Sequence, residues 1–214
     1  MSRDRTQADW REQFRAHGLD ESDVAADPLT QFDTWFEEAV GAGVYQPDAM
    51  VLATAGADGA PTSRHVLLRA VDEGFVFYTN YESRKGEELV ANPRASITVG
   101  WVPIGRQVLV VGTVEETTEE ESDEYFASRP RPSQLAAWAS DQSRPLRGRA
   151  ELDERFAAAS AEWEGTSVER PPYWGGFRLL PDEVEFWQGR ADRLHDRLRY
   201  ERDGDAWTVH RYAP

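Results

Sequence analysis

The chain has 214 residues, of which 40% are hydrophobic, and a formal net charge of -15 from 24 Lys and Arg against 39 Asp and Glu. This length and apolar content suit one compact globular domain, and the acidic balance argues against nucleic acids and anionic membrane surfaces as partners. The absence of cysteine excludes disulfides and thiolate chemistry, and the four dispersed histidines lack metal-ligand spacing, so no metal centre is expected.

The first part of the chain predicts two helices and then a hairpin. Residues 7–16 form a strongly charged helix within an N-terminal arm, 1–26. A second helix runs from Asp27-Pro28 to about Val40, and its aromatic residues at helical spacing, Phe32, Trp35 and Phe36, should pack on the core. The apolar runs 50–54 and 62–71 flank turn residues at Asp58-Gly59, which is typical of a hairpin.

The middle of the chain alternates strands and helices. Strands are expected at 75–79, 95–102 and 107–114, and a short helix at 84–91 ends before Asn92-Pro93. The segment Thr118-Glu119-Glu120-Glu121 is a capping-box pattern and predicts the start of another helix. That helix should stop near Arg129, because Pro130 and Pro132 follow.

The last part of the chain predicts a helix at 151–162 and then strands over 173–212, with Gly175-Gly176 and Gly204 as turn points. Without a break in composition, 27–214 is expected to be a single domain. Helices among hairpin-linked strands favour an α+β fold, a closed or split antiparallel barrel. A doubly wound nucleotide fold is disfavoured, because neither a phosphate loop nor a Gly-x-Gly-x-x-Gly turn is present.

The sequence also carries expectations about location. No apolar run approaches the roughly 20 residues that a membrane-spanning helix needs. The start of the chain, Met1-Ser2-Arg3-Asp4-Arg5, lacks the apolar core of a signal peptide. We therefore expect a cytoplasmic protein without a membrane partner.

The stretch from Phe186 to Arg197 is the strongest candidate for a ligand site. Interpreted as a strand, it places Arg193, His195 and Arg197 on one face, with Trp187 just upstream. Three cationic or ionisable groups side by side repel one another, so such a row indicates an anionic or electron-rich ligand in front of it.

Three further segments are candidate anion sites. Arg64 and Arg69 bracket an apolar strand and suggest two separate anions, although charges at strand ends that reach solvent explain them equally well. Ser83-Arg84-Lys85-Gly86 opens a helix, where backbone N–H groups favour an anion. Tyr125 and Arg129 share a helical face, with Ser133 beyond the proline break, and could hold a phosphate monoester. Gln142-Ser143 is a weaker polar signal.

These segments, in order, resemble the pyridoxamine 5'-phosphate oxidase family. The resemblance runs from about Asp27 to Pro214 and rests on the joint order and spacing of several motifs. They are Arg64-His65-Val66-Leu67-Leu68-Arg69, Phe77-Tyr78-Thr79-Asn80, Ser83-Arg84-Lys85, Arg106-Gln107-Val108, Tyr125-Phe126, Ser128-Arg129-Pro130-Arg131, Ser133-Gln134, Gln142-Ser143, Trp174-Gly175-Gly176-Phe177 and the stretch from Phe186 to Arg197.

The resemblance implies an FMN-binding split β-barrel that works as a homodimer, with each active site built from both chains. It implies that FMN contacts Arg64, His65, Val66, Leu67, Leu68, Arg69, Tyr78, Thr79, Arg84, Lys85, Gln107, Gln142, Ser143, Trp187 and Arg197. The substrate phosphate would meet Arg69, Tyr125, Arg129 and Ser133, while Arg193, Leu194 and His195 would lie over the pyridine ring. Arg193 and His195 are the expected catalytic residues, and Arg11 matches an arm residue that can fold over the site as a lid.

The implied reaction oxidises pyridoxamine or pyridoxine 5'-phosphate to pyridoxal 5'-phosphate. A hydride equivalent leaves the substrate for the flavin, O2 is reduced to hydrogen peroxide, and the amine substrate also releases ammonia. Because the flavin carries the redox step, the protein's task is positioning and electrostatics.

Two departures from the family pattern are visible. Arg69 stands where lysine is common, which keeps the charge but changes the geometry. Phe14 stands where a related enzyme has tyrosine, so a phenol hydrogen bond is lost. Two alternatives stay open: a non-catalytic FMN- or pyridoxal phosphate-binding protein, and a related split-barrel flavoenzyme for another substrate, such as a phenazine precursor.

Overall fold

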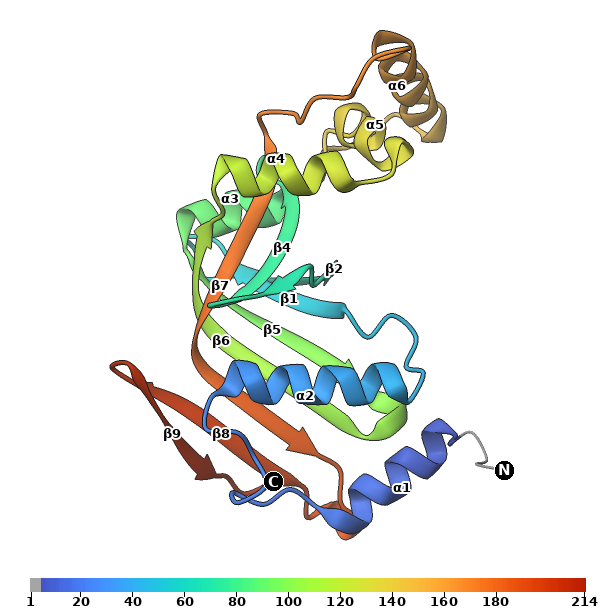
Figure 1. The fold of residues 1–214 in the computed structure, drawn as a ribbon. Coiled ribbons are helices and arrows are strands. Elements are labelled where there is room, and N and C mark those ends of the chain that lie inside the picture. Colours follow the sequence, from blue (N-terminus) through green and yellow to red (C-terminus); the bar gives the residue numbers. More distant parts are fainter. Residues whose placement is uncertain (1–4) are drawn as a thin grey trace.

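The computed structural model describes residues 5–214 and shows a curved, nine-stranded antiparallel sheet with helices around it (Figure 1). The strands are β1 Ala49–Ala55, β2 Pro61–Leu67, β3 Ala70–Val71, β4 Phe75–Asn80, β5 Arg94–Trp101, β6 Arg106–Glu116, β7 Trp174–Gln188, β8 Asp196–Asp203 and β9 Ala206–Arg211. The sheet order is β2-β1-β5-β6-β7-β4-β3, and β8 pairs with β7 and β9. This half-barrel confirms the α+β split-barrel expectation.

The helices gather mainly at the two ends of the sheet (Figure 1). They are α1 Gln7–His17, α2 Pro28–Gly41, α3 Arg84–Ala91, α4 Glu119–Ser128, α5 Arg131–Ala139 and α6 Arg149–Glu162, with short 3-10 turns η1 Val102–Ile104 and η2 Ala191–Arg193. In Figure 1, α3, α4 and α5 lie at one end, and α1 lies at the other beside the connection from β7 to β8. None of the helices in residues 5–214 has the length and apolar character needed to cross a membrane.

Helix α2 covers the core as its aromatic spacing predicts. Asp27 caps the helix by accepting from the Thr30 amide, and Pro28 occupies its first turn. The Phe32 ring meets the edge of Phe75 with a centroid distance of 5.0 Å, and Trp35 meets Phe186 in the same way at 5.0 Å. One helix thereby packs against both β4 and β7.

Strand β7 pairs with three other strands of the sheet. Along one edge it pairs with β6; along the other, its first half pairs with β4 and its second half with β8. The prediction of a turn at Gly175-Gly176 is wrong, because both residues lie inside β7. Close packing explains why these positions are glycine, because a Cβ at Gly175 would lie 2.0 Å from the Tyr81 hydroxyl oxygen. The turn at Gly204 is confirmed, with a positive φ of 62°.

Two further differences separate prediction and structure. The strand predicted over 62–71 is interrupted at Leu68-Arg69, because β3 leaves β2 to pair with β4. The capping box of Thr118 and Glu121 forms as predicted. After Pro130, however, the chain starts helix α5 at once, because proline without an N–H is tolerated in a first helical turn.

Candidate functional site

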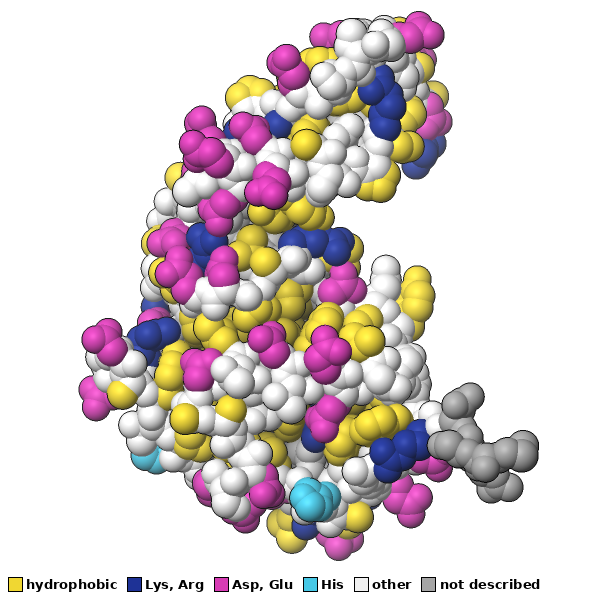
Figure 2. All heavy atoms as spheres, in the orientation of Figure 1, with side chains coloured by type: hydrophobic (Ala, Val, Ile, Leu, Met, Phe, Trp, Pro, Cys, Tyr) yellow, Lys and Arg dark blue, Asp and Glu magenta, His cyan; other side chains and the backbone are white. Residues whose placement is uncertain are grey.

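A polar cavity of about 460 Å³ lies between the end of β2, strand β4 and helices α3 to α5. Its lining combines cationic, hydroxyl and aromatic groups: His65, Val66, Leu67, Arg69, Tyr78, Thr79, Lys85, Tyr125, Arg129, Pro130, Ser133, Gln142 and Trp174. Figure 2 shows the molecule hollowed between its helical end and the sheet, with Lys and Arg atoms at the wall of the hollow. The structure thus brings together most of the residues predicted from the segments 64–69, 83–86 and 125–133, and also Gln142.

One cationic centre of the cavity lies at the start of α3. The Lys85 ammonium donates to the hydroxyl oxygens of Thr79 at 2.9 Å and Ser83 at 3.1 Å, and to the side-chain oxygen of Gln142. Burial, and then the charge of Arg64, lower the pKa of Lys85 from 10.5 to about 8. An anion in front of this ammonium would relieve both effects, which suits a phosphate group.

A second cationic centre lies where α4 ends. The Arg129 guanidinium stands 4.6 Å from the ring centroid of Trp174, and its Nη1 atom is buried without a hydrogen-bond partner in the described part of the chain. Burial lowers the pKa of Arg129; the Tyr125 phenol opposes this shift and the charge of Arg69 adds to it. An unsatisfied buried guanidinium nitrogen is costly, so this position favours an anionic hydrogen-bond partner.

Three nearly parallel rings hold this second centre in place. Tyr78 and Tyr125 stack with centroids 4.0 Å apart, and Trp174 lies 5.6 Å from Tyr78. Because the rings come from β4, α4 and β7, they fix the position of α4 relative to the sheet. The sequence indicates Trp174 only as part of the motif Trp174-Gly175-Gly176-Phe177, because its stacking partners, Tyr78 and Tyr125, lie far from it along the chain.

Two predicted residues of the first segment lie outside this cavity. Arg64 turns toward the hairpin and donates to Thr54, Thr62 and Glu88. Leu68 is buried and lines a smaller cavity of about 270 Å³ beside α2.

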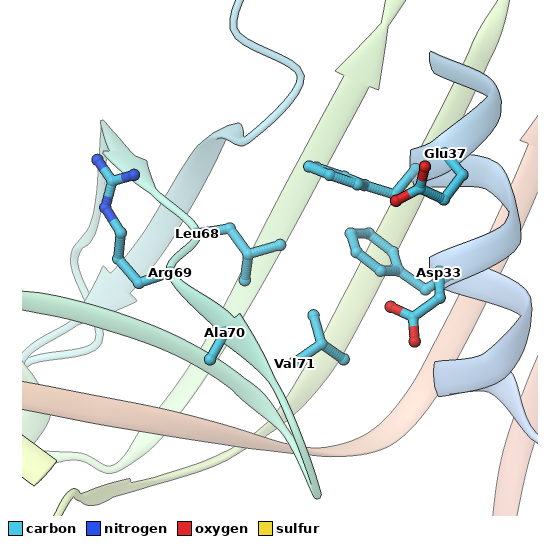
Figure 3. A pocket seen from close by; sticks show the side chains of 8 residues that line it. Asp33, Glu37, Leu68, Arg69, Ala70 and Val71 are labelled. Atoms are coloured by element: carbon cyan, nitrogen blue, oxygen red, sulfur yellow. The ribbon is translucent and has the colours of Figure 1, made fainter. Parts of the chain in front are cut away.

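Figure 3 shows this smaller cavity, with Asp33 and Glu37 on α2 facing the segment that carries Arg69. Burial, and then the charges of Asp27 and Glu37, raise the pKa of Asp33. Because these carboxylates repel anions, the smaller cavity is unsuited to phosphate. Arg69 borders both cavities and pairs with Asp48 at 3.1 Å.

A second group of predicted site residues lies on adjacent strands. Gln107 is opposite Trp187 in the β6–β7 pair, and Trp187 is opposite Arg197 in the β7–β8 pair. The His195 ring lies 4.6 Å from Trp187, and Arg197 makes a two-point salt bridge with Glu185 at 3.0 and 2.9 Å. These residues form a platform of ring faces and charge.

The prediction that Arg193, His195 and Arg197 share one strand face is wrong. The strand stops at Gln188, and Asp192 and Arg193 adopt positive φ values of 57° and 61° within a 3-10 turn. Two contacts explain the break: the Gly189 amide donates to the carbonyl of Gly105, which is distant in sequence, and the Arg190 amide donates to His195 Nδ1 at 3.1 Å, which closes a loop. Arg193 and Leu194 are therefore exposed on a loop tip.

The N-terminal arm packs beside this platform. Phe14 is buried with its ring 3.5 Å from the Arg106 guanidinium, and the Leu19 amide donates to Asp196 at 3.0 Å. Arg11 is exposed and lies near Gly105. Within one chain the arm thus lies at the platform end, away from the polar cavity (Figure 1). The lid role of the arm stays a prediction.

The cavity and the platform stand at opposite ends of β7. Trp174 lines the cavity and Trp187 belongs to the platform, so 13 steps of strand, roughly 40 Å when extended, separate them. Gln142 joins the cavity, whereas the exposed Ser143, Arg84 and Arg193 line neither. One chain therefore holds two parts of the predicted site without joining them.

The curved antiparallel sheet defines a split-barrel protein, and its polar cavity carries two cationic centres. Residues 36–163 match the family model described as pyridoxamine 5'-phosphate oxidase, and residues 174–214 match the pyridoxine 5'-phosphate oxidase C-terminal dimerisation region. The chain belongs to the pyridoxamine 5'-phosphate oxidase family.

Curated relatives carry the same family name. The pyridoxine/pyridoxamine 5'-phosphate oxidase of Rubrobacter xylanophilus is 54% identical over 205 residues, which cover 95% of this chain and 94% of that protein. The Burkholderia multivorans protein of that name is 53% identical over 213 residues, which cover 98% and 99%. The similarity therefore extends over both the cavity and the platform.

Two solved structures share the fold. PhzG from Burkholderia lata, in complex with tetrahydrophenazine-1-carboxylic acid, matches with a TM-score of 0.86 and 37% identity, covering 92% of this chain and 98% of PhzG. A pyridoxamine 5'-phosphate oxidase-related, FMN-binding protein from Nostoc punctiforme matches with a TM-score of 0.70 and 15% identity, covering 89% of this chain and 100% of that one. The second likeness shows the fold alone.

Proposed function

We propose that the protein is an FMN-dependent oxidase that converts pyridoxine and pyridoxamine 5'-phosphates to pyridoxal 5'-phosphate with O2. The observation that carries this proposal is the pair of cationic centres in one cavity, Lys85 at the start of α3 and Arg129 at the end of α4. A flavin mononucleotide and a phosphorylated pyridine each bring one phosphate, so the two ligands fill two centres.

The residues present fit FMN. Its phosphate would meet Arg64, Arg84 and Lys85 at the N-terminus of α3, where backbone amides add to the side-chain charges. The remaining contacts would come from residues 65–69, Tyr78, Thr79, Gln142 and Ser143 near the cavity and from Gln107, Trp187 and Arg197 on the platform. When bound, FMN supplies two-electron redox chemistry between the substrate and O2.

The substrate phosphate would lie at the second centre. Arg129 offers its unpaired Nη1 atom, Arg69 adds a charge, and the Tyr125 and Ser133 hydroxyls complete the donors. Arg193, Leu194 and His195 would lie over the pyridine ring and orient the C4' carbon. The Arg190 amide donates to His195 Nδ1, which leaves Nε2 as the atom that carries a proton in the neutral ring and can donate to the substrate.

The proposed reactions balance as follows. Pyridoxine phosphate loses two hydrogens from its C4' alcohol, and O2 takes them up as H2O2. Pyridoxamine phosphate loses two hydrogens in the same way, water supplies the aldehyde oxygen, and ammonia leaves. The side chains bind, orient and donate hydrogen bonds; none forms a covalent bond to the substrate.

We further propose a homodimer with shared active sites. Cavity and platform lie at opposite ends of β7, and the platform residues Trp187, His195 and Arg197 belong to the segment that matches a dimerisation region. A two-fold arrangement in which the platform of one subunit covers the cavity of the other would complete two sites at once.

The proposed activity is tested with purified protein loaded with FMN. We expect a flavin absorption spectrum and formation of pyridoxal 5'-phosphate and H2O2 from both phosphorylated substrates. A yellow protein that makes no peroxide would instead indicate the non-catalytic binding protein. A protein that FMN cannot reconstitute would refute the proposal.

The likeness to PhzG favours one second candidate, oxidation of a reduced phenazine precursor. Phenazine acids carry a carboxylate and no phosphate, so they leave part of the Arg69 and Arg129 donor set unused. We expect kcat/KM for pyridoxine phosphate to exceed that for a dihydrophenazine acid; the reverse order would favour the second candidate.

The pKa of Lys85 predicts how FMN binding depends on pH. With a pKa of about 8 in the FMN-free protein, Lys85 is cationic below pH 8 and loses its charge above it. Phosphate favours the cation, so the Kd of FMN should rise above pH 8, by up to about tenfold per pH unit. Fluorescence titrations from pH 6.5 to 9.5 measure this. Lys85→Arg keeps its charge and should flatten the curve; a rise of the same size in both proteins would contradict the assignment.

A further inference from the structure

Glu88 lies on α3, one turn after Arg84, and is a buried carboxylate at which groups from β1, β2 and α3 meet. It is 8% exposed. The hydroxyls of Thr54 on β1 and Thr62 on β2 each donate to it at 2.6 Å. Arg64 on β2 donates at 3.2 Å, and Arg84 on α3 donates through Nε at 2.8 Å.

The carboxylate is held in its charged form. Burial alone would raise its pKa, but the hydrogen bonds from Thr54, Thr62, Arg84 and Arg64 outweigh burial and lower the pKa to about 2. A buried charge with this many donors has a single orientation, and so do the groups that bind it.

Both arginines that Glu88 holds, Arg64 and Arg84, lie outside the lining of the polar cavity. Arg64 uses both terminal nitrogens within the hairpin, toward Thr54, Thr62 and Glu88. Arg84 binds Glu88 through Nε, and its side chain is 64% exposed, so its terminal nitrogens stay accessible to a ligand. Glu88 thereby fixes the stem of one guanidinium and the plane of the other.

We infer that Glu88 is a positioning residue of the phosphate end of the FMN site. It holds the stem of Arg84 so that the terminal nitrogens of this guanidinium stay free for the phosphate, and through Arg64, Thr54 and Thr62 it ties α3 to the β1–β2 hairpin. This inference rests on the proposed FMN site. Charge alone predicts the opposite effect. A carboxylate close to a bound phosphate repels it, so removal of the Glu88 charge would by itself tighten FMN binding.

The test is FMN affinity, measured by quenching of flavin fluorescence in the wild type and in Glu88→Gln. The amide keeps the size of the side chain and removes the charge. We expect the Kd of FMN to rise about tenfold or more, because two charge-assisted hydrogen bonds lose their acceptor charge. The matched control is Glu87→Gln. Glu87 is the neighbour of Glu88 and forms an exposed pair with Arg144, so this change removes the same charge outside the buried cluster. Its Kd should stay within about twofold of the wild type.

A double-mutant cycle separates positioning from a general loss of structure. If Glu88 acts through Arg84, Glu88→Gln should weaken FMN binding less in an Arg84→Ala background than in the wild type. The melting temperature of each FMN-free variant reports folding. Should Glu88→Gln fail to fold, Glu88→Asp carries the test, because its shorter carboxylate keeps the charge and cannot reach both arginines.

The outcomes are distinguishable. Equal or tighter FMN binding by folded Glu88→Gln, or additive effects in the cycle, would overturn the role of Glu88 while the FMN site stands. Absence of FMN binding by the wild type would overturn the proposed function and this inference with it.

Discussion

Replacing Arg129 with alanine is expected to lower kcat/KM for pyridoxine 5'-phosphate by about 100- to 1,000-fold. Its Nη1 atom is buried and unpaired in the described residues, beside Trp174 and near Arg69, so a bound phosphate would gain a desolvated, charge-assisted contact there. Steady-state kinetics with pyridoxine phosphate measure the loss.

Two controls define this result. The FMN spectrum of Arg129→Ala should match that of the wild type, because Lys85 and the start of α3 are untouched. Arg149→Ala removes an exposed arginine from a surface pair with Asp153 and should leave kcat/KM unchanged. Full activity of Arg129→Ala would remove the second cationic centre from the substrate site.

Replacing Arg106 with methionine is expected to destabilise the protein by about 3 kcal/mol, a fall of roughly 6–12 °C in Tm. Arg106 is 6% exposed, lies between the rings of Phe14 and Trp35 at 3.5 and 4.1 Å, and pairs with Glu38. Methionine fills part of the space but leaves Glu38 unpaired and Gln188 without its donor.

The same change should release the N-terminal arm. Because Phe14 packs on Arg106, limited proteolysis should cut between α1 and α2 faster in Arg106→Met. Arg94→Met, which breaks an exposed pair with Asp182, is the matched control and should cost less than about 1 kcal/mol. Melting curves at one protein concentration compare the three proteins, and equal Tm values would refute the buried-cation account.

Local rules predicted those elements whose signals lie within a few residues. The Thr118 capping box and the Asp27-Pro28 start placed helices α4 and α2, because caps act on the next three residues. The same local rules predicted a strand at 189–195, where the structure has a loop. The Gly189 amide donates to the distant Gly105 carbonyl, and the chain leaves the strand there. Alternation of side chains cannot reveal a partner so far along the sequence.

The residues of the candidate site also divide into those that sequence motifs predict and those that only the tertiary structure reveals. Motif order predicted that Arg69, Lys85 and Arg129 belong to one site, and the structure brings them to one cavity. Their binding of phosphate stays a prediction. Glu88 was missed: its spacing of four from Arg84 is a signal of a helical pair, but its contacts with Thr54 and Thr62 depend on how α3 docks on the hairpin. Tertiary docking of this kind leaves no local trace.

The activity of a mixed dimer shows whether each active site is shared between two subunits. One subunit carries Arg129→Ala in the cavity, the other carries Arg193→Ala beside the platform, and different affinity tags allow the mixed dimer to be purified. If each site joins the cavity of one subunit to the platform of the other, one of the two sites is intact. The mixed dimer should then show about half the wild-type activity, while both parent homodimers are nearly inactive. A mixed dimer as inactive as its parents would contradict the shared site.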